Sequence, residues 1–152
     1  MTLEKATLAD WEAVETLARE VHSLHVAWRP DIYEMPRELY PQERFQQGLE
    51  AGNMYVARRE NQVVGYVTIK IRDYDWAGMV PRRVLFLDEL CVAQDHRCQG
   101  IGRAMMVALR ALARAEGCTG MQLGVYPQNR EAVAFYEACG FALQSVTMSA
   151  KL

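Results

Sequence analysis

The spacing of apolar residues along the chain first has a helical period, then alternates as in strands, and then becomes helical again. From Leu8 to His22 apolar side chains recur every three or four residues, which predicts a helix with one buried stripe. Thr7 is the expected N-cap, and Asp10 falls in the first turn. A short first strand is predicted over residues 3–7, and a second helix over Gln42–Ala51. The proline-containing segment between the helices is predicted to be irregular.

The middle of the chain has the pattern of a sheet. Glu60 and Asn61 form a predicted turn between the first two strands, and residues 74–82 form a predicted loop before the third. The third strand is apolar at nearly every position except Asp88 and Glu89, which indicates a central strand buried on both faces. The three predicted strands are Met54–Arg58, Val63–Ile71 and Val84–Val92.

Helices and strands alternate again in the last third. The predicted elements are a helix over Gly100–Glu116, a strand over Met121–Val125, a helix over Asn129–Cys139 with Asn129 as N-cap, and a last strand from Phe141. The resulting order, β-α-α-β-β-β-α-β-α-β, predicts an α/β fold with a mixed sheet. A chain of 152 residues is expected to form a single domain over residues 1–152.

Composition narrows the class of protein. Hydrophobic residues make up 51% and charged residues 24%, which argues against intrinsic disorder. The formal net charge of −2 provides no field that attracts nucleic acid, and no apolar stretch is long enough to span a membrane. The first residues do not resemble a signal peptide, so a cytoplasmic protein is expected. The four cysteines lack metal-ligand spacing, so no metal is expected.

A glycine-rich turn follows the central strand. Arg97 and Arg103 flank a segment in which Gly100 and Gly102 open a helix. Free N–H groups at a helix start and nearby guanidinium groups favour a diphosphate. The segment is neither a Walker loop nor a G-x-G-x-x-G fingerprint, and the glycines alone are equally typical of a tight strand-to-helix turn.

A second group of residues lies in the last predicted helix. Asn129 and Tyr136 are seven residues apart, which places them on one helix face, about 10.5 Å apart along the axis. Considered alone, Tyr136 is also typical of a core aromatic residue whose hydroxyl is paired.

Together these two segments resemble the GNAT superfamily of N-acetyltransferases. Arg97-x-x-Gly100-x-Gly102 matches the acetyl-CoA pyrophosphate motif, and Asn129 to Phe141 matches the second signature block. The resemblance implies a mixed, mostly antiparallel central sheet with splayed parallel strands, flanked by about four helices, and acetyl-CoA bound between those strands. The cofactor-binding residues it implies are Leu90, Cys91, Val92, Arg97, Cys98, Gln99, Gly100, Ile101, Gly102, Arg103, Asn129 and Tyr136.

The chemistry of amine acetylation selects candidate catalytic residues. An ammonium must lose a proton before it attacks, and a leaving thiolate benefits from a donor. The resemblance places Tyr136 near the thioester sulfur as the acid. Asp88 and Glu89 are the candidate bases, and strand alternation sends them to opposite faces unless a bulge shifts the phase. Glu89 is favoured, and at least one of the two is expected to be structural.

The expected function is direct acetyl transfer from acetyl-CoA to a primary amine in a ternary complex, with a small-molecule amine favoured. The segment of residues 22–41 is a candidate acceptor wall or a shielding loop, and residues 74–83 are a candidate acceptor wall or dimer contact. A protein N-terminal or lysine acetyltransferase, a non-catalytic CoA-binding regulatory module and an interaction protein stay open. The sequence also leaves a homodimer open.

Overall fold

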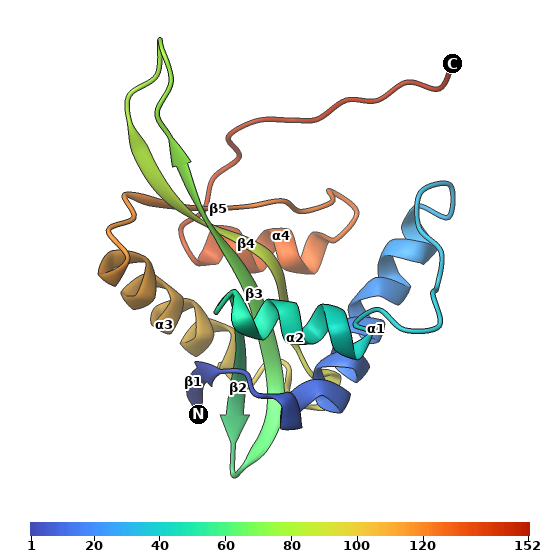
Figure 1. Ribbon diagram of the computed structural model, residues 1–152. Coiled ribbons are helices and arrows are strands. Elements are labelled where there is room, and N and C mark those ends of the chain that lie inside the picture. Colours follow the sequence, from blue (N-terminus) through green and yellow to red (C-terminus); the bar gives the residue numbers. More distant parts are fainter.

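The centre of the protein is one five-stranded sheet with the strand order β1-β2-β3-β4-β5. The computed structural model describes all 152 residues (Figure 1). The first four strands pair antiparallel, and β4 and β5 pair parallel, which confirms the mixed, mostly antiparallel sheet. The strands are β1 (Thr2–Lys5), β2 (Met54–Arg59), β3 (Gln62–Tyr74), β4 (Arg82–Val92) and β5 (Gly120–Leu123).

Four α-helices cover the two faces of the sheet (Figure 1). Helices α1 (Trp11–Trp28) and α2 (Gln42–Glu50) pack on one face around Val14, Phe45 and Tyr66. Helix α3 (Ile101–Ala115) packs on the other face around Leu85 and Met105, and α4 (Arg130–Ala138) lies beside it. Two short 3₁₀ helices, η1 (Leu8–Asp10) and η2 (Gln94–His96), precede α1 and α3. The predicted fold class is therefore confirmed, and none of the helices is both long and apolar enough to cross a membrane.

The predicted cap forms at the 3₁₀ turn that precedes α1: Thr7 is the N-cap of η1, whereas Asp10 is the N-cap of α1. The Thr7 N–H and hydroxyl both donate to the Asp10 carboxylate, at 2.8 and 3.0 Å, so the two residues form a capping box. Helix α1, however, runs to Trp28, six residues beyond the predicted end at His22. The extension follows from sequence, because no glycine or proline interrupts the helix before Pro30.

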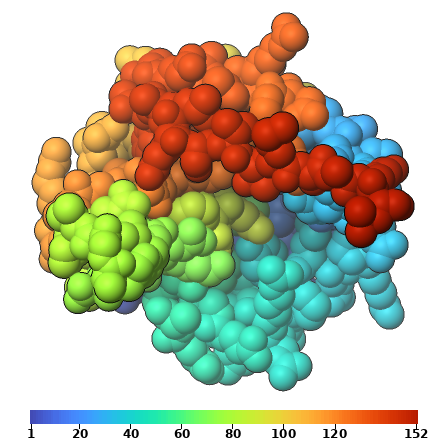
Figure 2. Space-filling view, turned by 90° about the horizontal axis from the view of Figure 1, so that it is seen from above, coloured from blue at the N-terminus to red at the C-terminus, as the bar shows by residue number.

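The predicted last strand does not form. After α4 the chain from Phe141 to Leu152 has no regular structure, and β5 is the edge of the sheet. The Gln122 side chain on β5 donates to the Gln144 side chain at 2.8 Å, but no backbone ladder joins the two segments. The C-terminal segment continues along the surface to the end of α1, where Lys151 lies near Asp31 (Figure 2). The prediction of a paired last strand is therefore wrong: the segment contacts β5 through side chains and forms no backbone ladder with its outer edge.

Candidate functional site

A β-bulge in β4 determines where the two acidic residues point. Thr68 of β3 pairs with Glu89 and Ile69 pairs with Leu87, so Asp88 is the extra residue of the bulge. Without it, Leu87 and Glu89 would face the same side of the sheet. The bulge shifts the phase, so that Leu87 packs on the α3 side while Glu89 and the following Cys91 face α1 and α2.

Glu89 lines a small cavity between α1, α2 and the sheet. Its Oε2 atom accepts hydrogen bonds from the Tyr40 hydroxyl at 2.5 Å and the Tyr66 hydroxyl at 2.8 Å. The cavity measures about 50 Å³, and its lining includes His22, His25 and Arg44. Burial and the nearby His22 lower the pKa of His25, so this imidazole is neutral at pH 7. Glu89 is therefore the carboxylate that borders this cavity.

Asp88 lies in a different environment. Its side chain is ion-paired with Lys70 of β3, and it does not border the cavity. Both side chains are partly exposed to solvent, so the pair contributes little to stability. The structure thus separates the two candidate bases: Glu89 faces the cavity and Asp88 is held by a neighbouring ammonium.

The parallel strands part where β4 continues beyond β5. Their pairing ends at Leu87 and Leu123, while β4 runs on to Val92. Since the Ala93 N–H donates to Val64 of β3, strand alternation turns the backbone groups of Leu90 and Val92 away from β3, into the space past the end of β5. The resemblance implies that these groups bind the amides of a pantetheine arm, and this contact stays a prediction.

The predicted diphosphate segment forms a turn with two left-handed residues. Cys98 has φ = 58° and Gly100 has φ = 81°, and a Cβ atom built on Gly100 would meet nothing within 4 Å. Gly100 is the N-cap of α3 and has no side-chain cap, so the first N–H groups of the helix are free for an anion. Gln99 is held by Arg59, whose guanidinium donates to its side-chain oxygen at 2.8 Å.

The side chain of Arg97 is directed toward β4 and α1. Its Nε donates to the Val92 carbonyl at 3.0 Å, and its guanidinium lies 3.8 Å from the Glu20 carboxylate of α1. One Oε atom of Glu20 is buried without a hydrogen bond, so this contact is loose. Contact between Arg97 and a diphosphate stays a prediction, and the same holds for Arg103.

Gly102 has a structural role that sequence alone did not show. A Cβ atom at this position would lie 3.2 Å from the ring of Phe135 on α4, closer than side chains normally approach. The missing side chain therefore lets α3 and α4 pack closely, in addition to any role at a phosphate.

Asn129 and Tyr136 are both positioned by α4. Asn129 is the N-cap, as predicted, and its side-chain oxygen accepts the Ala132 N–H at 3.1 Å. The ring of Tyr136 packs edge-on against Phe135 and Phe141. Burial, with smaller contributions from Cys139 and Cys91, raises the pKa of Tyr136 to about 12, so the hydroxyl keeps its proton at neutral pH.

Aromatic side chains cluster beside the cavity, where the end of α1 meets the segment after β5. The Tyr33 and Tyr126 hydroxyls are 2.7 Å apart and bridge these two parts of the chain. His25 stacks on Tyr33, and the His22 ring nitrogen Nε2 lies 2.8 Å from the Glu34 carbonyl oxygen. The 22–41 segment therefore contributes side chains to the cavity wall, and its role as an acceptor wall stays a prediction. Residues 75–81, in contrast, are the connection of the β3–β4 hairpin.

Two residues of the site were missed by sequence reasoning. Tyr66 shares one face of β3 with Thr68, the residue that pairs with Glu89, and this strand alternation was the one signal that could have placed it beside Glu89. Tyr40 had no local signal, because it lies in an irregular segment 49 residues before the carboxylate that it contacts.

Comparison with known proteins agrees with this geometry. Residues 12–141 match the model of the acetyltransferase (GNAT) family. A 78-residue stretch, 51% of the chain, is 31% identical to the thialysine N-ε-acetyltransferase of Bos taurus, of which it covers 44%. The solved structure of a tetramutant of the BH1408 protein from Bacillus halodurans is 28% identical, with full coverage of both chains and a TM-score of 0.94. The aminoglycoside N-acetyltransferase AAC(6')-Iy, solved with CoA, is 16% identical and shares the fold with a TM-score of 0.74, over 99% of this chain and 93% of its own.

A mixed sheet whose parallel strands part beside a glycine-rich helix start defines an acetyltransferase-type α/β fold. The family match spans most of the sequence, so the chain belongs to the GNAT acetyltransferase family. It spans less than half the length of the curated relative that it matches.

Proposed function

We propose that this protein transfers the acetyl group of acetyl-CoA to a primary amine, directly and in a ternary complex, with a small-molecule amine favoured. The observation that carries the proposal is the cavity-facing Glu89 on the segment of β4 that has parted from β5. A carboxylate there can take the proton of an ammonium, while the backbone of Leu90 and the N–H of Val92 hold the pantetheine arm. Acetyl-CoA supplies the activated acyl group as co-substrate, and no step of the proposal needs a metal.

Direct transfer is supported by the protonation of the Cys91 thiol, which lies two residues after Glu89 on β4. Burial raises the pKa of Cys91 to about 12, and its Sγ donates to the Leu17 carbonyl of α1 at 3.6 Å. A thiol that stays protonated is a poor nucleophile, so an acyl-cysteine intermediate at Cys91 is disfavoured. Tyr136, which also stays protonated, is the candidate donor to the departing thiolate.

The test combines cofactor binding with a substrate screen. Acetyl-CoA should raise the melting temperature, because a ligand that binds only the folded state stabilises it. Thiol release should then be measured with thialysine, aminoglycosides, polyamines, amino acids and peptides with free N-termini or lysines. Release with peptides alone would favour a protein acetyltransferase, and stabilisation without release from any amine would favour a CoA-binding regulatory module. An interaction protein would show neither effect.

Glu89→Gln and Asp88→Asn form a matched pair for the base. We expect Glu89→Gln to lower kcat/KM most below the pKa of the amine and less as free amine becomes abundant. Asp88→Asn should lower kcat/KM much less, because this carboxylate is paired with Lys70 away from the cavity. Equal losses in both variants at every pH would mean that the two residues shape the strand and move no proton.

We also propose that the protein forms a homodimer and is located in the cytoplasm. The C-terminal segment exposes Leu143, Val146 and Met148, whose exposed fractions are 85%, 74% and 92%, and a partner surface would cover them. Light scattering on the purified protein gives the oligomeric state, and a monomeric mass at micromolar concentration would refute the dimer.

A further inference from the structure

Two tyrosine hydroxyls meet at a single oxygen of Glu89. Tyr40 comes from the segment before α2, and Tyr66 comes from β3. Both hydroxyls bind Oε2, whereas Oε1 accepts no hydrogen bond from the chain. Oε1 is also not among the buried unpaired atoms, so it is open to solvent in the cavity. The carboxylate therefore has one occupied oxygen and one available oxygen.

We propose that Tyr40 and Tyr66 are positioning residues that fix the orientation of the Glu89 carboxylate, with Oε1 presented to the acceptor amine. The proposal rests on the proposed function, and it adds that the base works as a three-residue unit. Hydrogen bonds to a carboxylate favour its charged form, which is the form that accepts a proton. Two donors on one oxygen also fix the rotation of the carboxylate.

Both hydroxyls act as donors only. Burial, reinforced by the charge of Glu89, raises the pKa of Tyr40 and of Tyr66 above the ordinary phenol value. Neither phenol ionises at a pH where an amine acetyltransferase works, so each keeps its proton for Glu89. The ring of Tyr40 packs edge-on against that of Tyr66, with 6.4 Å between centroids, and Tyr66 is 2% exposed.

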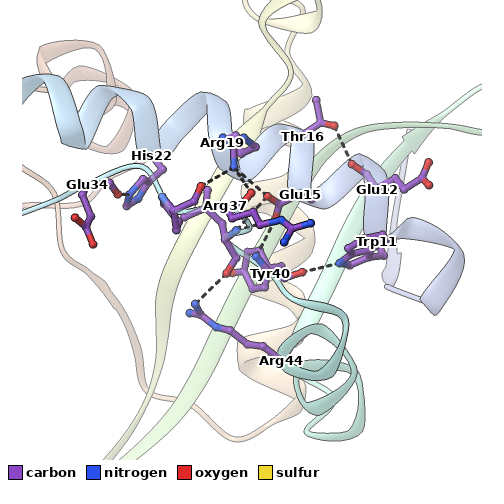
Figure 3. A network of polar contacts seen from close by, with 12 residues as sticks. Trp11, Glu12, Glu15, Thr16, Arg19, His22, Glu34, Arg37, Tyr40 and Arg44 are labelled. Atoms are coloured by element: carbon purple, nitrogen blue, oxygen red, sulfur yellow. Dashed lines mark hydrogen bonds and ion pairs between the residues drawn. The ribbon is translucent and has the colours of Figure 1, made fainter.

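Helix α1 fixes the backbone of Tyr40 from both sides (Figure 3). The Glu15 carboxylate accepts the Tyr40 N–H at 2.7 Å and the Leu39 N–H at 3.1 Å. The Trp11 indole donates to the Tyr40 carbonyl at 2.6 Å. Arg19 adds hydrogen bonds to the Pro36 and Arg37 carbonyls, both at 3.1 Å. A residue with both backbone groups bound cannot swing, so its hydroxyl is delivered to one place.

Other ionisable groups surround Glu89, and a test must separate them. Those that border the cavity or act on the unit by charge are His22 and His25 of α1, Arg44 of α2, and Asp88 and Cys91 of β4. Histidine is the side chain whose ordinary pKa lies between about pH 5 and about pH 8. His25 borders the cavity, so its contribution to a pH profile must be removed separately.

The experiment removes one hydroxyl at a time, with Tyr40→Phe and Tyr66→Phe, and uses Tyr33→Phe as the control. The Tyr33 hydroxyl is hydrogen-bonded to the Tyr126 hydroxyl and does not contact Glu89. We expect the acid limb of kcat/KM for the amine to move to higher pH in each test variant, because a donor to the carboxylate is lost. The limb should stay in place in the control, and the KM for acetyl-CoA should stay constant in all three variants. The same shift should appear for Tyr40→Phe in a His25→Asn background.

A second readout does not depend on turnover. The side-chain carboxyl carbon of Glu89, labelled with ¹³C and assigned by its loss in Glu89→Gln, is titrated by NMR in the protein without acetyl-CoA. Its midpoint should rise in Tyr40→Phe and stay unchanged in Tyr33→Phe. A Tyr40→Phe variant that loses kcat equally at every pH, with an unchanged midpoint, overturns the positioning role. A raised midpoint in a protein that acetylates no amine would support the hydrogen-bonded unit and refute the proposed function. If Tyr66→Phe does not fold, Tyr40→Phe alone decides.

Discussion

Replacing Tyr136 by phenylalanine isolates the interaction of one hydroxyl with the leaving group. The ring packs against Phe135 and Phe141 at centroid distances of 5.3 and 5.8 Å, and phenylalanine keeps both contacts. The hydroxyl makes no hydrogen bond within the chain, so its loss leaves no partner unpaired. We therefore expect the melting temperature to change by less than about 3 °C, the shift that roughly 1 kcal/mol produces in a domain of this size.

The size of the catalytic effect follows from the pKa of about 12 that burial gives Tyr136. Coenzyme A thiols have a pKa near that of a free thiol, about 8.5, so full proton transfer from this phenol to the thiolate is uphill by roughly 5 kcal/mol. Tyr136 is then expected to stabilise the thiolate by a hydrogen bond and to retain its proton. A hydrogen bond to a charged group contributes about 1.5–3 kcal/mol, which corresponds to a loss of roughly 10- to 200-fold in kcat.

The assay measures kcat, the acetyl-CoA Kd and the melting temperature on one preparation of each variant. Tyr55→Phe is the matched control, because Tyr55 packs against the same core as Tyr136 and also makes no hydrogen bond through its hydroxyl. The Kd should stay constant in both variants, since the hydroxyl matters once charge develops on sulfur. Turnover near the wild-type value in Tyr136→Phe would remove the residue from the mechanism. A loss far above 10³-fold with normal stability would instead refute the hydrogen-bond argument and indicate full proton transfer.

Three further predictions concern the frame of the site. Gly102→Val should lose the acetyl-CoA-dependent rise in melting temperature. Gly102→Ala displaces only the Phe135 ring, so this variant should be less stable than the wild type but keep most of the rise. Equal rises in the valine variant and the wild type would exclude the phosphate role of Gly102. Burial and His22 lower the pKa of His25 in the folded state, so the unfolded state binds more protons as pH falls through about 6.5, and stability is lost there. His25→Asn should therefore show a smaller fall in melting temperature between about pH 7.5 and about pH 5.5, and an unchanged fall contradicts the burial of this imidazole. Burial alone would raise the pKa of Asp10, but hydrogen bonds from Thr7 and from the Arg58 guanidinium lower it. Asp10→Asn should therefore lower the free energy of unfolding, measured in denaturant, by about 1–3 kcal/mol. A variant as stable as the wild type refutes this.

The sequence predicted those parts of the molecule in which local pattern and tertiary packing agree. The apolar stripe of α3 and the Asn129 cap of α4 formed as expected, because each depends on residues within a few positions of one another. Strand alternation predicted that Asp88 and Glu89 lie on opposite faces unless a bulge shifts the phase of the strand. The structure has such a bulge at Asp88.

What sequence could not predict depends on contacts across long separations. Tyr40 meets Glu89 only because Trp11 and Glu15 hold its backbone against α1, and neither interaction leaves a periodic signal. The side chain of Arg97 folds back to the Val92 carbonyl for a similar reason, since Glu20 of α1 lies there. The segment after Phe141 has the alternation of a strand but no neighbouring strand that pairs with it, and a ladder needs two partners.

Hydrogen bonds fix Pro36 and Tyr40 to α1, whereas the residues between Trp28 and Pro36 are less constrained in sequence. Trp28 ends a rigid helix, and the chain is clamped again from Pro36 onward, so residues 29–35 form a short span between two anchored ends. Changes in length or chemistry within such a span are absorbed locally, because the anchors carry the strain. If the proposed function is correct, a library varied only within these residues, other than Tyr33, would change the acceptor side while the contacts around Glu89 stay the same. For enzyme engineering, residues 29–35 are therefore the segment in which substitutions aimed at acceptor specificity should be tried first.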